Sequence, residues 1–182
     1  VLVINDPFLG GTHLPDVTVI TPVFLEGASA PEFYVGSRGH HADIGGTTPG
    51  SMPPFSTTIQ EEGVQINNFK LVAEGVLQES AMLALLSGGA YPSRNPSQNM
   101  ADLRAQLAAN EKGVQELTKM VVEFGLEVVQ AYMGHVQDNA EESVRRVITR
   151  LRNGVFTLPL DNGAQIQVAV RVDVENRSAE ID

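Results

Sequence analysis

Two short runs of sequence organise this chain: Gly10-Gly11-Thr12-His13-Leu14-Pro15-Asp16 and His40-His41-Ala42-Asp43-Ile44-Gly45-Gly46. Together they hold three of the four histidines, and an aspartate follows each histidine group closely. Neutral imidazole and carboxylate groups are ligands for divalent cations such as Zn, Mn or Fe. Neighbouring glycines let backbone or substrate come close to those ligands. We therefore interpret the rest of the chain as the scaffold that brings the two runs to one place.

The strands that flank these runs predict how they meet. Apolar segments favour strands at Val1–Ile4, Val17–Phe24 and Phe33–Ser37, and Asn5-Asp6-Pro7 is a turn signal after the first of them. If the second and third strands pair as an antiparallel hairpin, the start of one lies beside the end of the other. One rim of the sheet then collects five polar residues: Asp6, His13, Asp16, His41 and Asp43.

Alternation along an extended segment separates the two adjacent histidines. His41 and Asp43 are two residues apart and are expected to point the same way, with His40 pointing to the other face. Of this pair we therefore expect His41 to be the metal ligand and His40 to support it. The competing interpretation is that these are ordinary polar turn residues in loops rich in Gly and Pro.

Three further residues are candidates for catalytic roles: Asp6, Arg38 and His40. Asp6 and His40 lie at the same expected rim as the ligands. Arg38 precedes the histidines and could bind a substrate carboxylate with two parallel hydrogen bonds. Arg38 could equally pair with one of the surface acids, and Asp6 could simply stabilise the turn in which it lies.

The middle of the chain is predicted to be helical. Apolar residues recur about every 3.6 positions from 103 to 121, which favours a long helix over about 100–124 with Asn99 or Asp102 as its cap. Gly125 ends or interrupts this helix. A helical run over 126–137 follows, and a cap at Asp138 or Asn139 starts another helix over about 139–152.

The final part of the sequence is β. Gly154–Leu160 is an expected strand, Asp161-Asn162-Gly163 a hairpin turn, and Gln165–Glu175 alternates apolar and polar residues. The expected class is α+β, with antiparallel strands at both ends and a central helical block. We expect residues 1–182 to be a single domain or an N-terminal fragment of a longer polypeptide. Its parts are a strand and loop region (1–70), a mainly helical region (71–153) and a β-hairpin (154–182).

The composition excludes several functional classes. The net charge is −10, and the 12 Lys and Arg residues form no basic run, which argues against nucleic-acid and anionic-membrane partners. The chain has no cysteine, so thiolate catalysis, disulfides and cysteine-based zinc sites are excluded. The sequence contains no run of 18 apolar residues, the length that would suggest a membrane-spanning helix. We expect a cytoplasmic protein.

The motifs resemble those of a known family. Asn5–Asp16 and Ser37–Gly46 are similar to two signatures of the hydantoinase B/5-oxoprolinase family. Ser51-Met52-Pro53-Pro54 followed by Glu61-Glu62-Gly63 continues in the family's manner, and Asp102–Asn110 looks like its helical segment. The resemblance therefore runs in order across nearly the whole chain.

The resemblance implies a divided enzyme. Family members include ATP-dependent N-methylhydantoinases, 5-oxoprolinases, and acetone or acetophenone carboxylases. An A part binds ATP and activates the substrate by phosphorylation, and the B part completes ring opening or carboxylation. Carboxylase relatives hold a metal, manganese being the example. Carried onto this sequence, the resemblance implies a divalent metal (Mn, Zn or Fe) on ligands drawn from His13, Asp16, His41 and Asp43, with Asp6 nearby.

These expectations define one leading hypothesis and two alternatives. The leading one is part of an ATP-dependent hydrolase of cyclic amides such as hydantoin, N-methylhydantoin or 5-oxoproline. It would act in a hetero-oligomer with a hydantoinase A-like subunit that binds the ATP, and this chain alone would be inactive. The first alternative is a subunit of an ATP-dependent ketone carboxylase. The second is a non-catalytic structural or interface domain whose helical block docks the A subunit.

Overall fold

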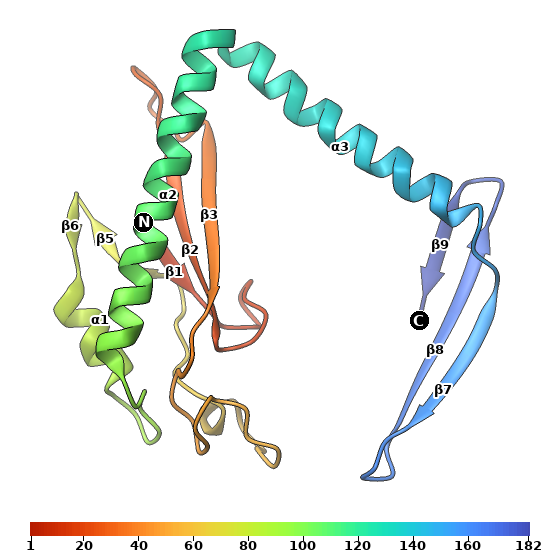
Figure 1. Ribbon diagram of the computed structural model, residues 1–182, viewed down its shortest axis with the longest axis horizontal. Helices are drawn as coiled ribbons and strands as arrows, with labels where there is room; N and C mark the ends of the chain where they lie inside the picture. The colour runs from red at the N-terminus through yellow and green to blue at the C-terminus, as the bar shows by residue number, and fades with distance from the viewer. The chain divides into compact units, whose positions relative to one another are not determined.

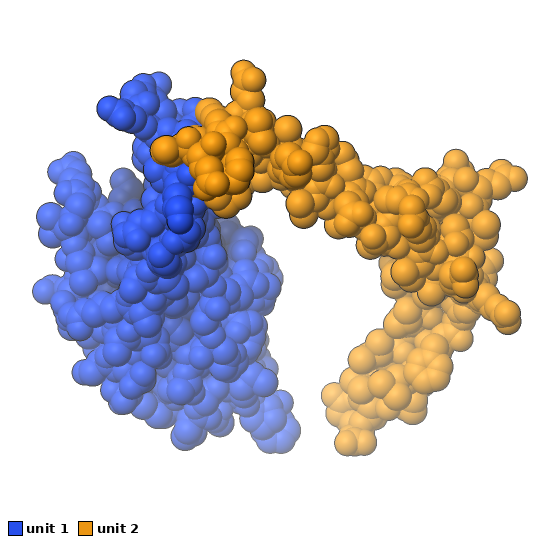
Figure 2. Space-filling view, turned by 45° about the horizontal axis from the view of Figure 1, so that its top comes forward, with its two compact units in different colours: residues 1–119 blue, residues 120–182 orange.

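The computed structural model describes residues 1–182 as two compact units, Val1–Lys119 and Met120–Asp182 (Figure 2). Antiparallel sheets lie at both ends of the chain, and three α-helices lie between them in sequence. This arrangement confirms the predicted α+β class. No helix combines the length and the apolar character that crossing a membrane requires.

Unit 1 is built on a four-stranded antiparallel sheet with the order β3-β2-β1-β4. Its strands are β1 (Leu2–Ile4), β2 (Asp16–Val23), β3 (Phe33–His40) and β4 (Phe69–Lys70). The predicted hairpin of β2 and β3 is confirmed, and its register pairs Asp16 with His40. The first residue of β2 therefore lies directly opposite the last residue of β3.

Several small elements complete unit 1. They are the 3-10 helix η1 (Ile59–Glu61), the two-residue strands β5 (Val72–Ala73) and β6 (Val76–Leu77), and helix α1 (Glu79–Leu86). The core joins alternate residues of the sheet, such as Val17 and Val19, to Met82 and Leu86 of α1 and to Leu103. Period-two burial along β2 is the pattern expected of a strand with one face against the core.

Helix α2 (Pro96–Phe124) runs along the sheet of unit 1 (Figure 1). It begins earlier than predicted because Asn95 is the cap: its Oδ1 accepts a hydrogen bond from the Gln98 amide at 3.2 Å. Pro96 suits the first helical position, where its missing N–H is not needed. Asn99 and Asp102, predicted as caps, therefore lie inside the helix.

Amide side chains fix α2 to the strands. Gln106 Nε2 donates to the carbonyl oxygens of Val17 at 2.9 Å and Ser37 at 3.2 Å, and Asn110 Nδ2 donates to that of Val19 at 3.0 Å. Both side chains are buried. Because buried amides are stable only when hydrogen-bonded, these contacts specify where α2 lies along β2 and β3.

Helix α3 (Leu126–Ile148) and a three-stranded sheet form most of unit 2. Gly125, with φ +88°, separates α2 from α3 as predicted. The helix break predicted at Asp138 or Asn139 is absent, and α3 ends at Ile148 instead of near residue 152. Glu141 and Glu142 pair with Arg145 and Arg146 one turn later, contacts that stabilise a continuing helix.

The sheet of unit 2 has the order β7-β8-β9, with strands at Gly154–Pro159, Gln165–Asp173 and Ser178–Ile181. The predicted hairpin of β7 and β8 is confirmed, and β9 adds a third antiparallel strand. Arg177 Nη1 bonds Glu142 of α3 at 2.9 Å, which joins helix and sheet. Large apolar side chains remain exposed in this unit, including Tyr132, Val155 and Phe156.

Asn5 connects the end of β1 to two other segments. Its Nδ2 donates to the carbonyl oxygens of Leu14 at 2.8 Å and Val64 at 2.9 Å, and its Oδ1 accepts from the Ile66 amide at 2.6 Å. The side chain is completely buried. It therefore satisfies three backbone groups that solvent cannot reach.

Replacing Asn5 should destabilise the fold strongly. We expect Asn5→Ala to lower the free energy of unfolding by about 3 kcal/mol or more, since each buried unpaired group costs about 1–3 kcal/mol. Asn5→Asp keeps the acceptor and loses both donors, so it should also be destabilising. Exposed Asn67→Ala is the control. Urea denaturation measures all three, and equal stability of Asn5→Ala and the control would contradict the assigned role.

Candidate metal centre

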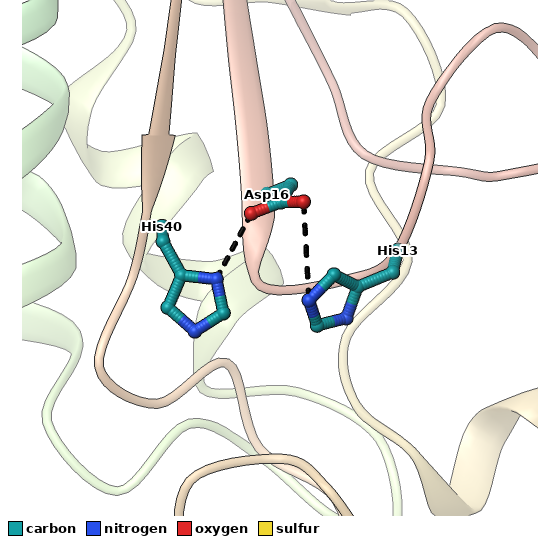
Figure 3. Close-up of side chains that lie close together, drawn as sticks. All are labelled: His13, Asp16 and His40. Carbon is teal, nitrogen blue, oxygen red and sulfur yellow. Dashed lines mark hydrogen bonds and ion pairs between the residues drawn. The ribbon is translucent and has the colours of Figure 1, made fainter.

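Two of the predicted ligands, His13 and Asp16, come together at the end of the β2–β3 hairpin with His40, which was predicted to be catalytic (Figure 3). Asp16 Oδ1 lies 2.9 Å from His40 Nδ1, and Asp16 Oδ2 lies 3.8 Å from His13 Nε2. One potential ligand atom from each residue lies within 4.8 Å of the other two. We call this group the His-Asp-His cluster.

Local backbone contacts explain why these residues meet. The turn before β2 is closed by the Asp16 amide, which donates to the His13 carbonyl at 2.9 Å. The His41 amide donates to the Pro15 carbonyl at 2.8 Å, which continues the β2–β3 pairing past His40. Leu14 is buried in the core between His13 and Asp16 and fixes the turn. The cluster is therefore held by backbone pairing and by core packing.

The electrostatics of the cluster keep Asp16 ionised. The hydrogen bond from His40 has the largest influence and lowers the pKa of the Asp16 carboxyl. Burial alone would raise this pKa, but positive charge on His13 or His40 and the hydroxyl of Thr12 add to the lowering, and the net pKa lies below its ordinary value. An ionised carboxylate is the form that binds a metal cation.

The donor set suits a catalytic divalent metal. Two imidazoles and one carboxylate with open positions are typical of Fe(II) sites and of catalytic Zn sites, and Mn accepts the same carboxylate-containing set. The His13 and His40 side chains are 41% and 58% exposed, so solvent or substrate can reach them. The residues present therefore fit a divalent metal.

The two adjacent histidines are placed the opposite way from the prediction. His41 is 2% exposed and is held by α2: its Nδ1 lies 3.0 Å from Asn99 Nδ2 and its Nε2 lies 3.2 Å from Gln106 Oε1. Since an amide nitrogen only donates, His41 Nδ1 accepts and Nε2 carries the proton. Both ring nitrogens of His41 are therefore engaged inside the fold.

The reason for the reversal lies in the strand register. Residues directly opposite each other in an antiparallel pair share one face of the sheet, and Asp16 faces His40. Alternation from Asp43, used in the prediction, does not apply because β3 ends at His40 and the chain turns there. The register that pairs Asp16 with His40 therefore places His40, and not His41, beside Asp16.

Asp43 is not brought into the cluster. Its Oδ1 accepts from the Gly45 amide at 2.9 Å and the Arg94 amide at 3.1 Å, and its Oδ2 accepts from Gly50 and from the Arg94 guanidinium at 2.8 Å. Burial alone would raise the pKa of Asp43. These hydrogen bonds together lower the pKa by a larger amount, so the net pKa is below its ordinary value. Asp43 thus organises the glycine loop after β3.

Arg94 is the partner that the sequence did not reveal. Besides Asp43, its guanidinium donates to the carbonyl oxygens of Gly45 at 3.4 Å and Gly46 at 2.8 Å. A Cβ on Gly45 would lie 2.3 Å from the Tyr91 carbonyl oxygen, so the two segments touch through backbone. Arg94 lies 51 residues from Asp43, and neither periodicity nor spacing signals this pairing.

Asp6 and Arg38 differ in their relation to the cluster. Asp6 is buried, and its Oδ1 accepts from the Phe8 amide at 2.9 Å, so it shapes the turn after β1. Arg38 is exposed on β3; its Nε donates to Thr18 at 2.8 Å and its Nη1 to Thr12 at 3.3 Å. Thr12 in turn donates to Asp16 at 3.3 Å. Arg38 is therefore linked to the cluster through one hydroxyl.

Comparison with known proteins gives a consistent set of relatives. The family model for hydantoinase B/oxoprolinase matches residues 1–182. The 5-oxoprolinase of Dictyostelium discoideum is 45% identical over the whole chain, which spans 15% of that relative's length. The chain therefore corresponds to a small part of that relative.

Two solved structures share the fold. The crystal structure of the ATP-dependent caprolactamase from Pseudomonas jessenii matches 99% of this chain and 31% of that chain, with a TM-score of 0.79 and 27% identity. The caprolactamase subunit beta of that organism is likewise 27% identical. Nucleotide-free acetone carboxylase matches 93% of this chain and 24% of that chain, with a TM-score of 0.72 and 19% identity. At this identity the second likeness concerns the fold alone.

The Asp43–Arg94 contact makes a pH-dependent contribution to stability. Because the folded-state pKa of Asp43 is lowered, its contribution is complete above the unfolded pKa of about 3.9 and is lost as the pH falls through the folded value. We expect Asp43→Asn to lower the free energy of unfolding at pH 7 by about 1–3 kcal/mol. The difference from wild type should shrink toward pH 3.

Urea denaturation at several pH values measures this effect. Exposed Asp138→Asn is the matched control and should leave the pH profile unchanged. A constant difference between Asp43→Asn and wild type from pH 7 to pH 3 would show that the charge of Asp43 does not contribute.

Proposed function

Since the chain belongs to the hydantoinase B/oxoprolinase family, we propose that it supplies the metal-binding part of an ATP-dependent enzyme that hydrolyses cyclic amides. The relatives support this class: 5-oxoprolinase and caprolactamase are named for cyclic-amide substrates. The observation that carries the proposal is the His-Asp-His cluster at the end of the β2–β3 hairpin.

The cluster would hold the metal through His13, Asp16 and His40. When bound, a divalent cation supplies Lewis-acid chemistry by polarising a carbonyl or phosphoryl oxygen. The chain's own contribution is to keep Asp16 ionised and to fix its orientation through His40 and Thr12. Because the cluster ends two paired strands, these groups are oriented before any substrate arrives, which lowers the cost of reaching the reactive geometry.

Arg38 is the proposed anchor for negative charge on the substrate. It lies two residues before His40 on β3, so both side chains project from the same face of the strand. Two of its N–H groups already donate hydrogen bonds: Nε–H to the Thr18 hydroxyl and one N–H of Nη1 to the Thr12 hydroxyl. A guanidinium has five N–H donors, so the remaining ones can bind a carboxylate such as that of 5-oxoproline.

ATP activation is assigned to a partner. The loop Gly45-Gly46-Thr47-Thr48-Pro49-Gly50 lacks the lysine of a Walker A motif, and Asp43 and Arg94 occupy its inner side. We propose a hydantoinase A-like subunit as the ATP-binding partner in a hetero-oligomer. One relative is named caprolactamase subunit beta, a name that implies an enzyme with more than one kind of subunit. This name supports the proposed division.

The alternatives are less well supported. A ketone carboxylase could use the same cluster, but the likeness to acetone carboxylase is one of fold, at 19% identity. A purely structural domain would not need two accessible imidazoles on one ionised carboxylate. Metal binding separates the structural alternative from both enzymes.

The two adjacent histidines should separate metal binding from stability. We expect His40→Ala and Asp16→Asn to abolish stoichiometric binding of Mn, Zn or Fe with little change in unfolding free energy, because both side chains are accessible. His41→Ala should lower stability by about 2 kcal/mol or more, since it leaves one N–H of buried Asn99 and the Oε1 of buried Gln106 unpaired. Elemental analysis and urea denaturation measure the two effects.

His41→Gln is the matched control, because a glutamine retains polar atoms for Asn99 and Gln106. This variant should remain folded and keep its metal. Loss of metal in folded His41→Gln, with retention in His40→Ala, would return the ligand role to His41 and overturn the proposed cluster.

Arg38 should determine preference for charged substrates. In the complete enzyme, Arg38→Gln should lower kcat/KM for 5-oxoproline roughly tenfold to a hundredfold, the cost of losing hydrogen bonds between charged groups. Hydrolysis of 2-pyrrolidinone, the same ring without its carboxylate, should change little. An equal loss for both rings would assign Arg38 a structural role, and no ATP-dependent hydrolysis of any cyclic amide by wild type would overturn the proposed function.

A further inference from the structure

Thr12 lies between the proposed substrate anchor and the His-Asp-His cluster. Its hydroxyl oxygen lies 3.3 Å from Arg38 Nη1 and 3.3 Å from Asp16 Oδ2. Thr12 and Arg38 are both exposed, so solvent and substrate can reach them. Thr12 belongs to the loop before β2, whereas Asp16 and Arg38 lie on the paired strands β2 and β3. One hydroxyl therefore bridges two side chains that the strand register places in different cross-strand pairs.

Hydrogen-bonding chemistry fixes the direction of this bridge. A guanidinium N–H can only donate, an ionised carboxylate can only accept, and a hydroxyl has a single proton. The Thr12 proton therefore points to Asp16, and the Thr12 oxygen accepts from Arg38. Hydrogen bonds in such a series polarise one another, so the charge of Arg38 strengthens the contact between Thr12 and Asp16. The anchor and the metal ligand are thus linked in the order Arg38, Thr12, Asp16.

Two threonines hold the guanidinium of Arg38 in place. Thr18 lies directly opposite Arg38 in the register of β2 and β3, and its hydroxyl accepts from Nε at 2.8 Å. Thr12 is the second point of attachment, at Nη1. With both contacts the plane of the guanidinium is fixed, whereas with Thr18 alone the group would be free to turn about Nε. Thr12 therefore determines how close the positive charge lies to Asp16.

The charge of Arg38 lies within electrostatic range of the cluster. Two consecutive contacts of 3.3 Å separate Arg38 Nη1 from Asp16 Oδ2, and together they span less than the screening length of about 8 Å at physiological ionic strength. A cation held by the cluster would be repelled by this guanidinium. An anion bound to the guanidinium would relieve that repulsion, so the two binding events influence each other.

We propose that Thr12 is a positioning residue that couples binding of the substrate carboxylate at Arg38 to binding of the metal at the His-Asp-His cluster. This inference rests on the proposed function and adds a specificity determinant to its site. Each ligand raises the affinity for the other, since coupling between two sites is reciprocal. A cyclic amide that carries a carboxylate, such as 5-oxoproline, is thereby favoured over the same ring without one.

Manganese titration of the complete enzyme tests this coupling. ATP is left out, because the proposed hydrolysis requires it and the substrate then stays intact. Electron paramagnetic resonance of free Mn²⁺ gives the Kd for the metal in the presence of saturating 5-oxoproline or 2-pyrrolidinone. In wild type we expect the Kd to be about fivefold or more lower with 5-oxoproline, the lower end of typical coupling between two sites. Since the two rings are the same, the difference measures the effect of the carboxylate.

Variants of Thr12 isolate the role of its hydroxyl. Thr12→Val keeps the shape of the side chain and removes the hydroxyl, so the advantage of 5-oxoproline should largely disappear. Thr12→Ser keeps the hydroxyl and should retain the advantage. Thr157→Val, at an exposed strand position of unit 2, is the matched control and should behave as wild type. A merely structural effect of Thr12 would change both Kd values by one factor and leave their ratio unchanged.

Several results would overturn the coupling while leaving the proposed function intact. An unchanged advantage of 5-oxoproline in Thr12→Val would show that the carboxylate acts on the metal without Thr12, and its loss in Thr12→Ser as well would deny the hydroxyl a role. Complete loss of manganese from Thr12→Val would make the hydroxyl a metal ligand instead of a link. Absence of the advantage in wild type that binds metal would contradict the coupling directly. Wild-type enzyme that bound no metal would overturn both proposals.

Discussion

The buried hydrogen bonds of His41 are the interaction on which the site depends. The imidazole accepts a hydrogen bond from Asn99 and donates one to Gln106. Two residues of α2 therefore hold the residue that follows β3. Gln106 then reaches the carbonyl oxygens of Val17 and Ser37. Leaving any of these groups unpaired in the core costs about 1–3 kcal/mol, so the network has one satisfactory arrangement. Helix and hairpin are thereby fixed in register.

That register decides what faces outward. With His41 turned inward, His40 lies opposite Asp16 on the accessible face. His13 joins them because buried Leu14 fixes the turn between it and Asp16. Asp43, bound to Arg94, performs the corresponding task for the glycine loop that follows. The accessible cluster is therefore the outer side of an arrangement whose inner side is a satisfied polar core.

The sequence predicted the hairpin but not the choice between neighbouring histidines. Apolar segments indicated β2 and β3, and the structure confirms the antiparallel pairing that was assumed for them. Which of His40 and His41 is buried depends on contacts with Asn99 and Gln106, 58 and 65 residues away. The pairing of Asp43 with Arg94 has the same origin. The continuity of α3 was missed because Asp138 and Asn139 look like caps, while side-chain pairs one turn apart support the helix beyond them.

The inner face of α2 shows why apolar periodicity alone was a weak guide to this site. Its buried residues are Asn99, Met100, Leu103, Gln106 and Asn110, three amides and two apolar residues at helical spacing. Amides are suited to this face because they bond strand carbonyls that leucines could not satisfy. The next stripe around the helix, one residue earlier at 98, 102 and 105, lines a cleft between α2 and the end of β3. Since a helix is rigid over these turns, the hydrogen bonds of the buried amides also fix this stripe relative to the end of β3.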